Sequence, residues 1–220
     1  MGKVRLKYIK TGRAKYISHL DLTATMQRAI IRCGAALKYS EGFNPHPFLS
    51  VALPLSVGIE SLCELMDVGL LAQEVASDLL QRITDCLPEG LLVTEAYTPE
   101  RKFADITWLE LRGLFTYDNG FEDGMDKKLI SRLSSDTIEI SKKTKRGQSI
   151  INIAPSIRDY KATILDEKTI ELSLKVTAQN PTLGPNNVLA AFDGAFSSLM
   201  PDFSGFTRVE VYDGDLKIFR

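Results

Sequence analysis

Both histidines of this 220-residue chain stand in polar stretches near its beginning, and histidine is the side chain whose charge changes most readily near neutral pH. His19 stands at the start of a predicted helix. His46 stands in the loop 39–48, where Pro45 and Pro47 are incompatible with a regular helix or a central strand. If this loop folds back over the helix N-terminus, the two imidazoles meet. The pattern therefore predicts a site for binding or for acid–base chemistry.

Further polar residues accompany the two histidines, which favours a shared pocket because ordered loops carry function more often than other segments. An alternative stays open. In it, Asp21 stabilises the start of the helix, His19 makes a local hydrogen bond, and Asn44 only builds a turn. The predicted binding residues of the pocket are Asp21, Arg28, Lys38, Glu41, Asn44 and His46.

A histidine pair suits the cleavage of RNA, because one imidazole can take the proton of a 2′-hydroxyl while the other donates to the leaving oxygen. His19 and His46 are therefore the candidate catalytic residues. They lack a His-x-x-x-His spacing, so no metal site is predicted. Cys33, Cys63 and Cys86 are too widely spaced for an iron–sulfur triplet or a zinc pair, and we interpret them as reduced buried thiols. No cofactor is predicted.

Charge is distributed unevenly although the net charge is only −1. Residues 1–50 hold nine Lys or Arg against two acids, and residues 51–100 hold nine acids against Arg82 alone. The basic segment indicates an anionic partner such as RNA, while internal pairing with the acidic segment is the alternative. The predicted nucleic-acid surface consists of Arg5, Lys7, Lys10, Arg13, Lys15, Lys143, Lys145 and Arg146.

The elements that position these residues are predicted by hydrophobic periodicity. Apolar residues at every second position from Val4 to Tyr8 indicate a strand, and Ser18 can cap a helix that ends near Gly34. Apolar periodicity also predicts a strand over residues 48–55, a helix over residues 73–87 and a helix that begins at Pro185. The whole chain then has the order β-α-β-β-α-β twice, in residues 1–97 and 106–220. This order predicts an α+β protein of two tandem ferredoxin-like halves with antiparallel sheets.

No stretch reaches the roughly 18 apolar residues that a membrane-spanning helix needs. The residues after Met1 also lack the apolar centre of a signal peptide. We therefore expect a cytoplasmic protein with no membrane partner.

Four runs of residues in the first half, together with the pair Arg28-Ala29, resemble a known family. They comprise a strand end with its turn, the start of the helix, the proline-containing loop and the Leu-Pro-Leu segment after it, at residues 8–12, 16–21, 39–47 and 53–61. Together these runs resemble the radical-SAM-linked protein family, a bacterial domain of unknown function encoded beside or fused to a radical SAM protein. The resemblance is specific through about residue 100.

The resemblance implies an accessory binding protein that works with a radical SAM protein, in RNA- or ribosome-linked modification, and is not itself the radical enzyme. The cysteine spacing agrees, because this chain lacks the usual [4Fe–4S] triplet. A fainter, fold-level similarity links the chain to CRISPR RNA endoribonucleases of the RAMP superfamily. It implies the alternative function, a metal-independent RNA-processing endoribonuclease that uses His19 and His46. The expected partners are thus a radical SAM protein and RNA.

Overall fold

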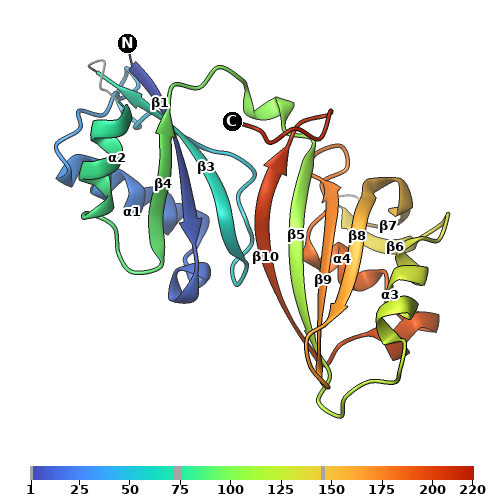
Figure 1. The fold of residues 1–220 in the computed structure, drawn as a ribbon. Helices are drawn as coiled ribbons and strands as arrows, with labels where there is room; N and C mark the ends of the chain where they lie inside the picture. Colours follow the sequence, from blue (N-terminus) through green and yellow to red (C-terminus); the bar gives the residue numbers. More distant parts are fainter. Residues whose placement is uncertain (1, 72–75, 145–146) are drawn as a thin grey trace. The chain divides into compact units, whose positions relative to one another are not determined.

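The computed structural model describes residues 2–71, 76–144 and 147–220. The chain forms two compact units, Met1–Asp105 together with Arg220, and Ile106–Phe219. Each unit is an antiparallel sheet with helices (Figure 1). The expected α+β class with antiparallel sheets is therefore confirmed.

The first unit pairs its strands in the order β4-β1-β3-β2, with every neighbouring pair antiparallel. Two helices lie against one face of this sheet (Figure 1). The elements are β1 (Gly2–Lys10), α1 (His19–Arg32), β2 (Leu49–Val51), β3 (Glu60–Leu70), α2 (Ala76–Thr84) and β4 (Leu91–Tyr97), with short 3₁₀ helices η1 (Gly12–Tyr16) and η2 (Phe103–Asp105).

Alternation along β1 explains how the sheet acquires two different faces. Val4, Leu6 and Tyr8 are buried in the core beneath the helices, so the residues between them lie on the opposite face. The helix α1 begins where the sequence predicts, because Ser18 Oγ accepts a hydrogen bond from the Asp21 N–H at 3.2 Å. The predicted strand and helix are therefore confirmed.

The second unit pairs β10, β5, β9 and β8 in that order and carries a separate hairpin of β6 and β7. Phe115 forms the centre of its core and makes edge-on ring contacts with Phe192 and Phe206, whose ring centroids both lie 5.9 Å away. The elements are β5 (Trp108–Thr116), α3 (Met125–Leu133), β6 (Glu139–Thr144), β7 (Gly147–Asn152), η3 (Ala154–Ser156), β8 (Ile157–Ile164), β9 (Thr169–Thr177), α4 (Pro185–Ala190), η4 (Gly194–Leu199) and β10 (Phe203–Tyr212).

Three expected boundaries differ from the structure. The strand expected at residues 48–55 is only Leu49–Val51, since Pro54 and Leu53, with its φ of 47°, leave the extended conformation. The helix expected over 73–87 is described only for Ala76–Thr84, and its first residues lie outside the described part of the chain. The helix expected beyond Pro185 ends at Ala190 and is followed by a 3₁₀ helix. In the described residues, no helix has the length and apolar character required to cross a membrane.

Candidate functional site

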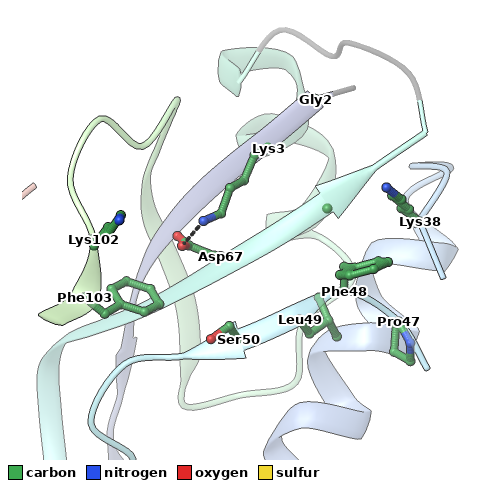
Figure 2. Close-up of a pocket in the computed structure, with 11 residues that line it drawn as sticks. Gly2, Lys3, Lys38, Pro47, Phe48, Leu49, Ser50, Asp67, Lys102 and Phe103 are labelled. Atoms are coloured by element: carbon green, nitrogen blue, oxygen red, sulfur yellow. Dashed lines mark ion pairs between the residues drawn. The ribbon is translucent and has the colours of Figure 1, made fainter. Parts of the chain in front are cut away.

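A pocket of about 540 Å³ lies in the first unit, on the sheet face opposite the helices (Figure 2). Its floor is formed by β1, β2 and β3, and η2 contributes one wall. Three lysines, one aspartate and two phenylalanines give the lining its chemical character, and these residues are Lys3, Lys38, Lys102, Asp67, Phe48 and Phe103.

Three backbone hydrogen bonds hold Lys38 and Phe48 beside β3. The Lys38 N–H donates to Gly69 O at 2.9 Å, the Phe48 N–H donates to Lys38 O at 2.9 Å, and the Gly69 N–H donates to Phe48 O at 2.8 Å. Glycine is required at 69, because a Cβ there would lie 2.7 Å from the Phe48 Cβ. This close approach places both the lysine and the aromatic ring at the pocket.

A buried ion pair holds Asp67, a residue of the pocket lining. Arg5 and Asp67 are directly paired residues of β1 and β3. Arg5 Nε and Nη2 donate to the two Asp67 carboxylate oxygens at 2.7 and 3.1 Å, and Arg5 Nη2 also donates to Arg101 O at 2.9 Å. Lys3 Nζ lies 2.7 Å from Asp67 Oδ2, on the pocket side (Figure 2). The two-point geometry fixes the guanidinium rigidly.

Each aromatic ring of the pocket has a cation over one face. The Arg5 Cζ lies 4.2 Å from the centre of the Phe103 ring, and Lys38 Nζ lies 4.9 Å from the centre of the Phe48 ring. Both distances are within the range of cation–π attraction. The rings stand at opposite ends of the pocket, with Lys3 between them (Figure 2).

The lining carries three ammonium groups and one carboxylate, a net charge of +2. Such a surface attracts an anion, and the two rings offer flat apolar contacts beside the charges. Among residues 2–71, 76–144 and 147–220, no group of three or more His, Cys, Asp or Glu is arranged to hold a metal ion. The pocket lining therefore suits an anionic ligand that also has an apolar part.

A second charged group occupies the same sheet face. Glu95 on β4 accepts hydrogen bonds from Lys7 Nζ at 2.8 Å and from Arg220 Nε at 3.1 Å. Burial raises the pKa of Glu95, but the Lys7 hydrogen bond and the Arg220 charge outweigh it and lower that pKa overall. Burial raises the pKa of the neighbouring Tyr97 to about 12, against the opposing charge of Arg5. Hydrogen bonds between oppositely charged side chains therefore hold this group in place on the sheet face.

Replacing Lys7 with Met is expected to raise the Glu95 pKa, because the hydrogen bond and a positive charge are lost while burial remains. The folded-state pKa of Glu95 is depressed, so its contribution to stability is present above its unfolded pKa and is lost as the pH falls through the folded value. An NMR titration of the Glu95 carboxyl carbon measures this shift. Arg13→Met, at an exposed position, serves as the control, and an unchanged Glu95 pKa in Lys7→Met would contradict the assignment.

The two histidines have different surroundings and neither lines the pocket. His19 is exposed at the first position of α1, and His46 is exposed in its loop. The loop is closed at its base, where the Ser40 N–H donates to His46 O at 2.8 Å and the His46 N–H donates to Ser40 Oγ at 2.9 Å. The loop base meets α1 through a 3.3 Å hydrogen bond from Gln27 to Tyr39. Gln27 is eight residues beyond His19, roughly 12 Å along the helix axis. A site shared by the histidines stays a prediction.

The other predicted binding residues are dispersed. Lys38 lines the pocket, whereas Asp21 takes part in the helix cap and accepts a hydrogen bond from Ser18 Oγ at 2.7 Å. Arg28 is exposed on α1, where it lines a separate hollow of about 560 Å³ with Arg32. Glu41 and Asn44 are exposed in the loop beside His46. Of the residues expected to form one pocket, only Lys38 lines the pocket beside β1, β2 and β3.

Two residues of the expected nucleic-acid surface are buried, and the surface itself stays a prediction. Arg5 is completely buried and Lys10 is 2% exposed, so neither presents its charge to a phosphate. Lys10 is buried because it continues the alternation of Tyr8 and so lies on the helix-covered face.

The remaining predicted basic residues differ in their surroundings. Lys7 and Lys15 are partly buried and paired with Glu95 and Glu60, while Arg13 is exposed. Lys143 is on β6, and Lys145 and Arg146 lie outside the described residues.

Sequence reasoning missed Phe48, Asp67, Lys102 and Phe103 as site residues. The sequence did contain a signal for Asp67, because an acidic residue within the largely buried strand Glu60–Leu70 needs a partner for its charge. The alternation of β1 likewise places Arg5 and Lys7 on one face. The position of Phe103 depends on the path of the segment after β4, which local sequence does not specify.

The fold and site define an α+β protein whose first unit carries a basic pocket with aromatic walls. The chain belongs to a family described as uncharacterized protein conserved in bacteria (DUF2344), whose model matches residues 3–185. The expectation of a bacterial domain of unknown function is thereby confirmed. A comparison with curated proteins found no match.

Proposed function

We propose that this protein is a non-catalytic accessory module that binds RNA and works with a radical SAM protein in RNA- or ribosome-linked modification. The observation that carries the binding function is the pocket of the first unit, where three lysines and two phenylalanines line one concave surface. Lysine ammonium groups pair with phosphates, and aromatic rings stack with unpaired bases. The combination fits RNA better than either a purely apolar or a purely acidic ligand.

The proposed radical SAM partner is supported by the four sequence runs described above, three of which adjoin or include pocket elements. Residues 8–12 include the end of β1, residues 39–47 include Pro47 of the pocket lining, and residues 53–61 include the start of β3. Cys33, Cys63 and Cys86 are too widely spaced in the sequence for the usual [4Fe–4S] triplet, which fits a supporting rather than a radical-generating role. Binding to a radical SAM protein encoded beside this chain is expected at micromolar concentration in a thermal-shift titration. No interaction at that concentration would count against the partnership.

We also propose that both units are ferredoxin-like. The support is the strand order, which places the last strand beside the first and the third beside the second in each four-stranded set: β4-β1-β3-β2 and β10-β5-β9-β8. In the second unit the hairpin β6–β7 then counts as an insertion after α3.

Replacing Lys38 and Lys102 with Ala is expected to weaken binding of a labelled single-stranded RNA about tenfold for each lysine, because each loses one charged contact with a phosphate. The slope of log K against log salt should fall by about 0.7 for each lysine removed. Fluorescence anisotropy at several salt concentrations measures both. Lys127→Ala, at an exposed position of the second unit, is the matched control. Equal binding by all variants would remove the pocket from the RNA interface.

A cleavage assay with the same RNA distinguishes the accessory function from the endoribonuclease alternative. Cleavage by the unchanged protein that disappears in His46→Ala would favour the histidine mechanism over the accessory function. Intact RNA after prolonged incubation is the result expected for a binding module.

A further inference from the structure

We infer that the pocket of the first unit accepts a single unpaired nucleotide, with its base packed on the Phe103 ring and its phosphate on the Lys38 side of the pocket. This inference rests on the proposed function, because it names the part of an RNA that the same pocket takes. It goes further, since it assigns separate tasks to the two ends of the pocket.

The size of the pocket favours one nucleotide. A volume of about 540 Å³ lies within the 300–1,000 Å³ range of pockets that enclose small molecules. A duplex is read by protein elements that protrude into its grooves, and a concave pocket does not supply such an element. An unpaired nucleotide, by contrast, can leave the stack and enter a hollow.

Phe103 is the better stacking platform because it is held rigidly. Arg5 covers one face of its ring at 4.2 Å, and Arg5 is itself fixed by Asp67 and by Arg101 O. The ring also lines the pocket. A base that packs on it therefore meets a surface already in place, which reduces the entropy lost on binding.

The opposite end of the pocket suits a phosphate. The Lys38 ammonium lies over the Phe48 ring at 4.9 Å, so a cation already occupies a face of this second ring. The backbone triangle among Lys38, Phe48 and Gly69 fixes the position of the lysine main chain. Lys3 stands between the two ends, where its ammonium is paired with Asp67 (Figure 2).

Isothermal titration calorimetry with three probes tests the assignment. Adenosine 5′-monophosphate is expected to bind at least tenfold more tightly than either adenosine or inorganic phosphate, since only the nucleotide reaches both ends. Phe103→Leu keeps apolar volume but removes the ring, and it should weaken the nucleotide about tenfold while leaving inorganic phosphate unchanged. Phe103→Tyr keeps a ring and should retain binding. Phe203→Leu, at an exposed phenylalanine of the second unit, is the control.

Nucleotide affinity no greater than phosphate affinity, or equal affinity in Phe103→Leu and the unchanged protein, would overturn the inference. Competition in the unchanged protein provides a measurement that does not depend on a variant. Adenosine 5′-monophosphate should displace a labelled single-stranded RNA if the pocket takes an unpaired nucleotide of that RNA. RNA binding that the nucleotide does not displace refutes the inference but leaves the proposed function. Nucleotide binding without any RNA binding refutes the function and supports a free nucleotide as ligand.

Discussion

Replacing Asp67 with Asn is expected to lower the free energy of unfolding by about 3–5 kcal/mol, because it leaves the buried Arg5 guanidinium without its counter-charge. The Arg5 side chain is completely buried and that of Asp67 is 7% exposed. Asparagine keeps the shape of the side chain, so the expected loss comes from charge and hydrogen bonding rather than from a cavity. Urea denaturation, followed by circular dichroism, measures the change.

The matched control is Glu60→Gln, which removes the carboxylate of a partly exposed pair. Lys15 Nζ lies 3.2 Å from Glu60 Oε1, and both side chains are about 30% exposed. Water screens such a pair, and the expected loss is at most about 1 kcal/mol. Similar losses of unfolding free energy in the two variants would show that burial does not make the Arg5–Asp67 pair more costly to break than a partly exposed pair.

A double replacement separates the cost of breaking the pair from the contribution of the pair itself. Arg5→Met combined with Asp67→Leu removes both charges and keeps apolar volume, and it should recover most of the stability lost in Asp67→Asn. Nucleotide binding should be weaker in this variant than in the unchanged protein, since Phe103 no longer rests on a guanidinium. Recovery of stability together with full binding would refute the supporting role of Arg5.

Local sequence was sufficient for the elements whose determinants are close together in the chain. The period of two in β1 identifies both the strand and the shared face of Arg5 and Lys7, and Ser18 identifies the start of α1. The burial of Lys10 follows from the same period, because it is the next residue after Tyr8 on the core side. Short-range sequence patterns thus predict the faces of strands and the ends of helices.

Such patterns do not predict the pocket, because its residues come together only through the register in which the strands pair. Arg5 and Asp67 are 62 residues apart and become partners only when β1 pairs with β3. A shift of one residue would place Asp67 on the helix-covered face. The two histidines, by contrast, were grouped because their segments lie near one another in the sequence. The base of the loop that carries His46 contacts the middle of α1, whereas His19 is the first residue of that helix.

Replacing Gly69 with Ala is expected to lower the free energy of unfolding by about 1–3 kcal/mol, since the added methyl group overpacks the contact between β3 and Phe48. The new Cβ would lie 2.7 Å from the Phe48 Cβ, which is not the flexible end of a side chain. Gly→Ala at a compatible position normally stabilises by about 0.4–1 kcal/mol, so even the sign of the change is diagnostic. Thermal and urea denaturation both measure it.

Two companion variants identify the contact. Gly205→Ala on β10 adds a methyl group whose nearest neighbour is 3.9 Å away, and no loss of stability from crowding is expected there. Phe48→Gly removes the opposing Cβ and should relieve the crowding in a Gly69→Ala background, whereas Phe48→Ala keeps that Cβ and should not. Equal rescue by both would place the strain elsewhere than between the two Cβ atoms. Because Phe48 and Lys38 share backbone hydrogen bonds with Gly69, displacement of Phe48 should also weaken the phosphate end of the pocket, and inorganic phosphate affinity in Gly69→Ala tests that coupling directly.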